Sequence, residues 1–249
     1  MTDIHRRHGF ATRAIHAGYR PDPGTGAVNT PIYASSTFAQ DGVGGLRGGF
    51  EYARTGNPTR AALEAVLAAV EEGRFGRAFS SGMAATDCAL RAVLRPGDHI
   101  VIPDDAYGVT FRLIDKVFRE WGVDHTPVHL SDLAAVRAAI TANTRMIWVE
   151  TPTNPLLSVA DIAAIAEIGR AAGLVVLVDN TFASPALQQP LTLGADIVLH
   201  STTKYIGGHS DVVGGALVTN SAELDTKFAF LQNGAGAVPG PFDAYLTMR

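Results

Sequence analysis

Short apolar runs that alternate with helix-like segments constrain the fold of this chain more than any other sequence feature. Residues 146–150, 174–178 and 196–200 each have the composition of a buried strand. The segment between the first two runs carries apolar residues at helical spacing. Strands that alternate with helices in this way are typical of a parallel sheet covered by helices. We therefore predict an α/β fold with a mostly parallel sheet flanked by helices.

Cap residues indicate where two of the predicted helices begin. Asn57 as the N-cap and Pro58 at the first helical position favour a helix start. Ser158 and Asp161 have the spacing of a capping box at the start of another helix. Apolar periodicity and glycine stops predict helices at residues 58–73, 83–94, 114–121, 133–140 and 158–173, and further strands at 99–102 and 214–219.

Composition argues against several classes of protein. The chain has 249 residues, of which 47% are apolar and 18% charged, so it can bury a large core. A net charge of −4 without a basic block argues against nucleic acid as a partner, and no apolar run is long enough to span a membrane. The polar segment Met1–His8 is not followed by an apolar signal region, and Cys88 is the only cysteine. We therefore expect a cytoplasmic protein without an intrachain disulfide. The histidines and the single cysteine show no metal-site spacing, so we expect no metal.

The N-terminal part of the chain differs from the rest in its many glycines and prolines. Such a segment builds little core by itself. We expect residues 1–57 to form an irregular arm that contacts a neighbouring subunit, and residues 58–240 to form one large α/β domain.

Polar side chains follow three of the predicted strands: Asn154, Asp179 and Lys204. Ligands of open parallel sheets bind beyond the carboxyl ends of the strands. A lysine that loses its proton can bond the aldehyde of pyridoxal 5'-phosphate (PLP), and a carboxylate can keep the pyridine nitrogen protonated. Alone, Lys204 would be an ordinary surface lysine and Asp179 a turn residue. Together with Ser201 and Thr203, they favour a PLP site.

Each further part of the candidate site has an ordinary alternative. Ser80–Met83 at a helix start could bind phosphate through backbone N–H groups, or could be a plain turn. Tyr107 could stack on a flat cofactor, or simply begin a helix. Asn154 could donate to the cofactor's phenolic oxygen, or stabilise a turn beside two prolines. Arg54, close to Tyr52, suits a phosphate group, although a surface arginine is the more common case.

Five ordered motifs give the chain a specific resemblance to a known family. The chain resembles the Cys/Met-metabolism PLP enzymes, and in particular their actinobacterial members that make cystathionine, from about Ala11 to its last residue. The motifs are Tyr52–Thr59, Ser80–Met83, Glu150–Pro155, Val178–Phe182 and His200–His209. The resemblance implies a fold-type I (aspartate-aminotransferase-like) PLP domain. It also implies that the C-terminal small domain is missing from this chain, with residues 241–249 as its truncated start.

The same resemblance implies roles for individual residues. Lys204 would be the imine lysine, Asp179 would bind the pyridine nitrogen, and Tyr107 would stack on the ring and serve as a second acid or base. The other implied cofactor-binding residues are Asn154 and Thr181, then Gly82, Met83, Ser201 and Thr203 around the phosphate, and Tyr52 and Arg54 from the neighbouring subunit. Active sites would then be shared between subunits of a homotetramer, a dimer of dimers.

The activity implied by the resemblance is γ-replacement, in which O-succinyl- or O-acetyl-homoserine reacts with L-cysteine to give cystathionine for methionine biosynthesis. Cystathionine cleavage and acylhomoserine sulfhydrylation use the same residues and stay open as alternatives, as does a catalytically incomplete PLP-binding fragment. Glu51 is a candidate for binding the amino end of the incoming cysteine. Val109 stands where the family often has glycine, so we expect a displaced loop or a narrower pocket beside Tyr107.

Overall fold

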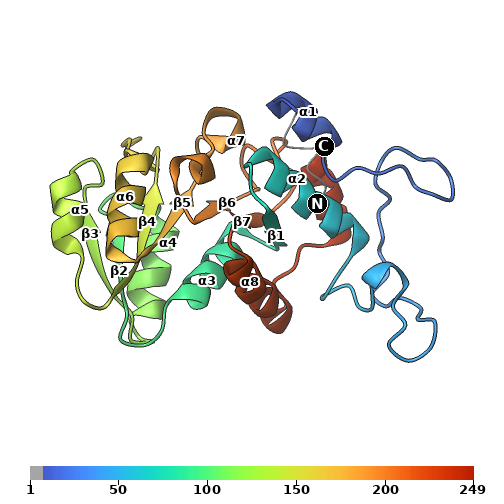
Figure 1. The fold of residues 1–249 in the computed structure, drawn as a ribbon, viewed down its shortest axis with the longest axis horizontal. Coiled ribbons are helices and arrows are strands. Elements are labelled where there is room, and N and C mark those ends of the chain that lie inside the picture. The colour runs from blue at the N-terminus through green and yellow to red at the C-terminus, as the bar shows by residue number, and fades with distance from the viewer. Residues whose placement is uncertain (1–7) are drawn as a thin grey trace.

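A seven-stranded sheet forms the centre of the molecule, with helices on both of its faces (Figure 1). The computed structural model describes residues 8–249. The strands are β1 (Phe75–Phe79), β2 (His99–Pro103), β3 (Asp124–Val128), β4 (Thr144–Glu150), β5 (Val175–Asp179), β6 (Ile197–His200) and β7 (Gly215–Thr219). Their order across the sheet is β1-β7-β6-β5-β4-β2-β3.

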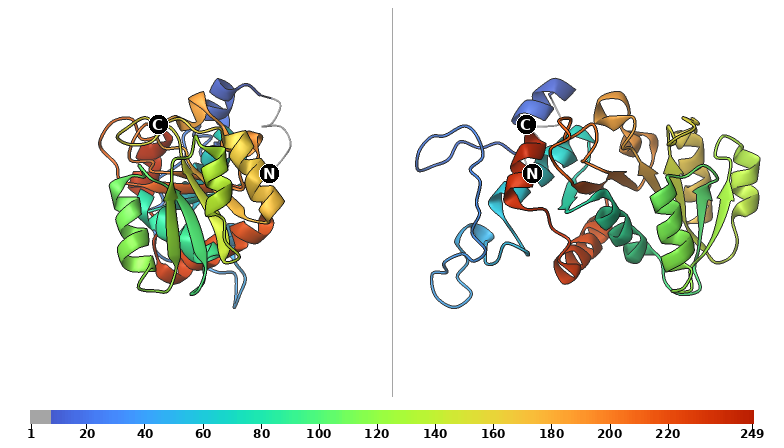
Figure 2. Two further views of the ribbon diagram at one scale, coloured as in Figure 1. Left: turned by 90° about the vertical axis from the view of Figure 1, so that its left-hand side faces the viewer. Right: turned by 180° about the vertical axis from the view of Figure 1, so that it is seen from behind.

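The helices pack against the two faces of the sheet, as the end-on and rear views show (Figure 2). They are α1 (Phe10–His16), α2 (Pro58–Val70), α3 (Gly82–Val93), α4 (Gly108–Arg112), α5 (Leu133–Ala139), α6 (Ile162–Ala172), α7 (Ser184–Leu187), α8 (Ala222–Ala235) and α9 (Pro241–Met248). A π-helical turn, Leu113–Phe118, continues α4, and short 3-10 turns lie at Arg47–Gly49 and Pro190–Leu193.

Strand directions confirm the predicted mostly parallel sheet. Neighbouring strands from β3 through β6 run parallel, whereas β7 is antiparallel to both β6 and β1. In the parallel part, Glu150 at the end of β4 is paired with Asp179 at the end of β5, and Asp179 with Leu199 of β6. Polar strand ends therefore meet at one edge of the sheet.

Alternate residues of the central strands supply separate cores on the two faces, as the two-residue period of a strand requires. Trp148, Leu177 and Leu199 pack in one cluster with α3 and α8. Val149 and Val178 point the other way, into a cluster beneath α6. Burying side chains of this size contributes about 1.5–3 kcal/mol each, which fixes the strand register and with it the positions of the strand ends.

Most of the predicted helices and strands are present, with one incorrect start. Asn57 caps α2 as predicted, accepting hydrogen bonds from the amides of Thr59 and Arg60. The capping box at Ser158 is wrong, because Asp161 alone caps α6 by accepting from the amide of Ala164 at 3.0 Å. The helix predicted at 114–121 begins earlier, as α4, and β1, β3, α1, α7, α8 and α9 were not predicted.

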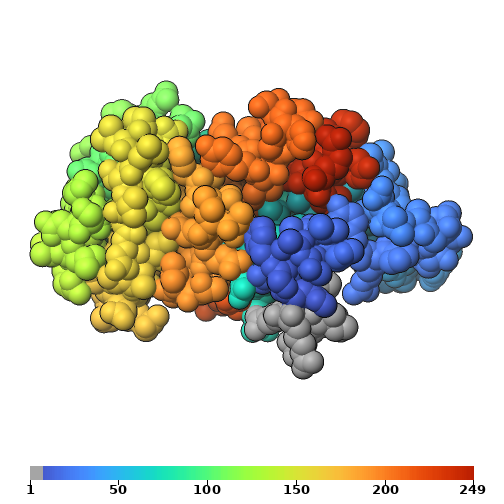
Figure 3. Space-filling model, turned by 90° about the horizontal axis from the view of Figure 1, so that it is seen from above, coloured from blue at the N-terminus to red at the C-terminus, as the bar shows by residue number. Residues whose placement is uncertain are grey.

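The N-terminal arm is not irregular throughout. Helix α1 packs on α2, where buried Arg13 forms an ion pair of 3.0 Å with Glu72. Gly18 follows with φ of +76°, and a Cβ atom there would lie 2.4 Å from the carbonyl oxygen of Ala62, so only glycine fits. Residues 20–56 extend from one end of the molecule (Figures 2 and 3). Residues 1–7, on which the expectation about a signal peptide depends, lie outside the described residues.

Helix α9 packs against α2 within a third apolar cluster, to which it contributes Ala244 and Met248. The hydroxyl of Tyr19 donates to the carbonyl oxygen of Met248 at 3.2 Å, so the end of α9 also contacts the start of the arm. None of the helices in residues 8–249 has the length and apolar character needed to cross a bilayer.

Candidate active site

Asp179 is connected to the loop that carries Lys204 through a single intermediate residue. A carboxylate oxygen of Asp179 accepts the N–H of Thr181 at 3.0 Å, and Thr181 Oγ1 accepts the N–H of Ser201 at 2.8 Å. Ser201 then receives the N–H of Lys204 on its carbonyl oxygen at 3.2 Å. The two strand ends chosen from the sequence are therefore brought together, and Thr181 is the link between them.

The start of helix α3 lies directly against this loop. A Cβ atom on Gly82 would lie 2.8 Å from Cβ and 3.0 Å from Oγ of Ser201, closer than real side chains approach. Ser81 caps the helix by accepting the N–H of Ala84 at 3.0 Å. The N–H groups of Gly82 and Met83 have no hydrogen-bond acceptor within residues 8–249. Free amides at a helix start attract an anion, so this glycine-lined cradle fits the phosphate of PLP.

The hydroxyl of Thr203 is bonded within its own loop. Its hydroxyl donates to the carbonyl oxygen of Gly214 at 3.2 Å and accepts the N–H of Gly214 at 3.0 Å. The hydroxyl proton is therefore engaged within the loop. Ser201 Oγ has no such contact within the described part of the chain and is the freer donor toward a phosphate.

Lys204 is exposed in this chain. The loop that carries it joins β6 to β7, two neighbouring strands inside the sheet.

Glu150 binds the backbones of Tyr107 and Asn154. Tyr107 was predicted to stack on the cofactor ring, and Asn154 to donate to its phenolic oxygen. Glu150 Oε2 accepts the N–H of Tyr107 at 2.8 Å, and its Oε1 accepts the N–H of Asn154 at 2.8 Å. The side chains of Tyr107 and Asn154 remain exposed. The sequence showed Glu150 as a polar strand end beside the predicted site, but did not show that two backbone amides converge on it.

The two adjacent carboxyl groups are less acidic than usual. Burial, together with the negative charge of Asp179, raises the pKa of Glu150 to about 7, against the opposing effect of the hydrogen bonds from Tyr107 and Asn154. Burial likewise raises the pKa of Asp179, while the hydrogen bonds from Thr181 and the nearby His200 act in the opposite direction. A cationic group placed beside Asp179, such as a protonated pyridine, would stabilise its ionised form.

A buried polar network lies on the opposite face of the sheet and was missed from the sequence. Glu71 accepts hydrogen bonds from His200 and from the side-chain amide of Asn180. The side chain of Gln188 in turn donates to Oδ1 of Asn180. Glu71 and Asn180 have no exposed surface. The network ties the ends of β5 and β6 to α2, which supports the positions of Asp179 and of the Lys204 loop from behind.

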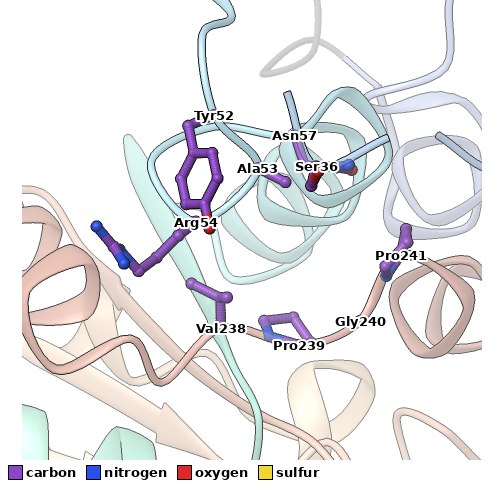
Figure 4. A pocket seen from close by; sticks show the side chains of 9 residues that line it. All are labelled: Ser36, Tyr52, Ala53, Arg54, Asn57, Val238, Pro239, Gly240 and Pro241. Carbon is purple, nitrogen blue, oxygen red and sulfur yellow. The ribbon is translucent and has the colours of Figure 1, made fainter. Parts of the chain in front are cut away.

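Tyr52 and Arg54 are not brought to this site within the chain. The guanidinium of Arg54 lies over the ring of Tyr52, 5.3 Å from its centre, and its Nε donates to Asn233 of α8 at 3.2 Å. Both side chains line a pocket of about 240 Å³ between the arm and the segment before α9 (Figure 4). Its lining residues are Ser36, Tyr52, Ala53, Arg54, Asn57, Val238, Pro239, Gly240 and Pro241.

Three other side chains were singled out from the sequence. Cys88 is buried in α3, and burial raises the pKa of its thiol to about 12, as suits a packing residue. Val109 is half-buried inside α4, and Glu51 is exposed on the arm. Residues 8–249 contain no group of three or more His, Cys, Asp or Glu side chains placed to hold a metal ion.

Comparison with known proteins places the chain in a family. Residues 11–249 match the family model of the Cys/Met metabolism PLP-dependent enzymes. Over 97% of its length the chain is 85% identical to the cystathionine gamma-synthase of Mycobacterium tuberculosis, of which it covers 62%. The crystal structure of metB from Corynebacterium glutamicum superposes with a TM-score of 0.97 at 60% identity, covering 98% of this chain and 64% of the other. That of cystathionine gamma-lyase from Lactobacillus plantarum, complexed with L-serine, superposes with a TM-score of 0.94 at 50% identity, covering 97% of this chain and 63% of the other.

The relatives are longer than this chain. The chain spans less than two thirds of the length of the Mycobacterium tuberculosis protein and of both crystal structures. The family match, in contrast, extends over nearly all of this chain and includes every strand described above. The chain belongs to the Cys/Met metabolism PLP-dependent enzyme family.

Proposed function

We propose that the protein catalyses PLP-dependent γ-replacement, joining O-succinyl- or O-acetyl-homoserine to L-cysteine to form cystathionine. The observation that carries this proposal is the connection of Asp179 through Thr181 to the Lys204 loop, directly beside the anion-binding start of α3. The 85% identity to a cystathionine gamma-synthase supports the choice of reaction within the family.

Bound PLP would supply an electron sink for the negative charge that develops on the substrate's α-carbon. The N–H groups of Gly82 and Met83 and the hydroxyl of Ser201 would hold its phosphate, with Thr203 shaping the same loop. Asp179 would keep the pyridine nitrogen protonated, since a carboxylate beside that nitrogen stabilises its positive charge.

Residues on the other strand ends would act on the ring and on the substrate. Tyr107 would stack on the ring and Asn154 would donate to its phenolic oxygen. Lys204 Nζ would hold the cofactor through its aldehyde, and the amine of Lys204 would also accept the proton from the substrate's α-carbon. Tyr107 would serve as a second acid or base for the leaving and attacking groups.

We also propose that Tyr52 and Arg54 act in the site of a neighbouring subunit, within a cytoplasmic homotetramer. In support, the arm that carries them extends from one end of the molecule, and their contacts are with Asn233 and the segment before α9. Arg54 presents a planar guanidinium that suits a phosphate. Gel filtration with light scattering tests the assembly, and a monomeric active protein would contradict it.

A second candidate is cystathionine cleavage, because the chain is also 50% identical to a cystathionine gamma-lyase of known structure. Product analysis separates the two reactions. The purified protein is supplied either with acylhomoserine and cysteine or with cystathionine alone. Cystathionine cleavage without synthesis would reject the synthase proposal.

The cofactor itself is tested by absorbance. We expect a visible band from lysine-linked PLP in the purified protein, its loss in Lys204→Ala, and its retention in Lys116→Ala, which alters an exposed lysine beside Asp115. A band that persists unchanged in Lys204→Ala would show that another residue bonds the cofactor.

A further inference from the structure

Two loops that flank the proposed cofactor position are tied together by carboxylates. One loop, residues 104–107, follows β2, and the other, residues 151–158, follows β4. Glu150 directs one carboxylate oxygen to the N–H of Tyr107 and the other to the N–H of Asn154, each at 2.8 Å. A single carboxylate therefore engages both loops at once.

Asp105 makes a second connection in the opposite direction. From the first loop, its Oδ2 accepts the hydroxyl of Thr153 at 2.6 Å and that of Ser158 at 2.7 Å in the second loop. Charged acceptors form the stronger class of hydrogen bonds, so these contacts hold the two loops at a fixed separation.

The hydrogen bonds of Glu150 and Asp105 that join the two loops are called the clamp below. Glu150 places this clamp beside Asp179. The two residues are paired across β4 and β5, so their side chains lie on the same face of the sheet. Glu150 is only 5% exposed. The charged groups that face it are Asp179 from β5 and Asp105 from the first loop.

We propose that Glu150 is a positioning residue: its carboxylate sets the spacing of Tyr107 and Asn154, the two residues that would contact PLP, and Asp105 maintains the same spacing from the other side. The proposal rests on the function proposed above, because the ring is that of PLP. It assigns to Glu150 no contact with cofactor or substrate.

Two accepting oxygens are the property that distinguishes this role from simple packing. Glutamine has the same size but one acceptor oxygen, and its NH₂ group would face an N–H donor, leaving one of the two amides without its acceptor. Glu150→Gln thus removes half of the clamp with little change in volume. Glu167→Gln, on the exposed face of α6, is the matched control.

Amide hydrogen exchange, measured on the protein without PLP, reads the clamp directly. In Glu150→Gln we expect the amide of Tyr107 or of Asn154 to exchange about tenfold faster, the effect of one lost hydrogen bond, with no change in Glu167→Gln. We also expect PLP to bind about tenfold more weakly and its visible circular dichroism to change at saturation. If Glu150→Gln does not fold, Glu150→Asp is read in the same way, because its shorter side chain cannot reach both amides.

The outcomes separate this proposal from the proposed function. Unchanged exchange of both amides would overturn the clamp. Faster exchange with unchanged PLP affinity and dichroism would make Glu150 a structural residue only, and would equally overturn its positioning role. A protein that forms no lysine-linked PLP band would refute the proposed function, while the exchange rates would still decide whether Glu150 holds the two loops.

Discussion

Thr181 Oγ1 accepts the backbone N–H of Ser201 at 2.8 Å, which joins the loop after β5 to the loop after β6. Because Thr181 also donates its own N–H to Asp179, one residue fixes the carboxylate and the start of the Lys204 loop together. The candidate site is thus assembled by backbone amides that bind side chains of neighbouring loops.

Replacing Thr181 by valine tests that link. The methyl group that replaces the hydroxyl leaves the Ser201 amide without its acceptor, at a cost of about 1–3 kcal/mol. We expect the free energy of unfolding to fall by about 1–2 kcal/mol in urea, and PLP affinity to fall about tenfold in equilibrium dialysis. Thr226→Val, which removes an exposed hydroxyl bonded to Ala222, should change stability by less than about 0.5 kcal/mol. Unaltered PLP affinity in Thr181→Val would argue against the link.

Gly82 tests the cradle at the start of α3. In Gly82→Ala the new Cβ atom meets Ser201 at 2.8 Å, so the loop has to move away from the helix. We expect PLP affinity to drop by at least about tenfold and stability to fall by about 1–3 kcal/mol, the usual cost of overpacking. The matched control is Gly234→Ala in α8, where the new Cβ atom meets nothing within 4 Å. That change should stabilise the helix by about 0.5–1 kcal/mol. Equal effects of the two substitutions would contradict the cradle.

Asp179→Asn separates binding from chemistry. An asparagine amide fills the same space but cannot hold a proton on the pyridine nitrogen, so the ring becomes a weaker electron sink. We expect the rate of cystathionine formation to fall on the order of 100-fold or more, with the protein still folded and the visible PLP band retained. Since burial already raises the pKa of Asp179, removing its charge should not lower the free energy of unfolding at pH 8. Full activity in this variant would exclude Asp179 as the partner of the ring nitrogen.

The raised pKa of Glu150 predicts a pH-dependent stability of the protein without cofactor. The pKa of Glu150 is about 7 in the folded protein, against an ordinary value of 4.5 that applies in the unfolded chain. The folded protein therefore binds a proton on Glu150 more tightly than the unfolded chain does. The contribution of protonated Glu150 to the free energy of unfolding is therefore fully present below pH 4.5. This contribution, about 3 kcal/mol in all, is lost as the pH rises through 7.

Glutamine at this position has no proton to lose. Between pH 5 and pH 8 the free energy of unfolding of Glu150→Gln should therefore rise by about 2.5 kcal/mol relative to the unsubstituted protein. Guanidinium denaturation at the two pH values measures the difference, with Glu167→Gln as the control. Parallel pH profiles for the unsubstituted protein and Glu150→Gln would show that Glu150 does not titrate in this range.

The fold could be predicted where single strands carry their own signal. The runs ending at Glu150, Asp179 and His200 are apolar because both faces of the sheet are covered, and so they stand out in the sequence. Strand β3 is a partly exposed edge strand that contains Pro127, and β1 contains Gly76 and Arg77, so neither has that composition. The antiparallel direction of β7 depends on its partners and not on its own residues.

The candidate site likewise contains features that the local sequence predicts and features that it does not. The strand-end positions of Asp179 and Lys204 were predictable because position after a strand is a property of the local sequence. The roles of Glu150 and Glu71 were not, because each depends on contacts between segments far apart in the chain.

The reversal of direction at β7 has a mechanical consequence for Lys204. Its loop leaves the sheet at His200 and returns at Gly215, and these ends belong to adjacent strands with His200 paired to Ala216. Adjacent strands are only about 4.8 Å apart, so both ends of the loop are anchored at nearly the same place in the core. The base of the loop is held further by hydrogen bonds, because Ser201 donates its N–H to Thr181 Oγ1 and Thr203 Oγ1 bonds the backbone of Gly214. The position of the Lys204 backbone is therefore set jointly by β6, β7 and the loop that follows β5.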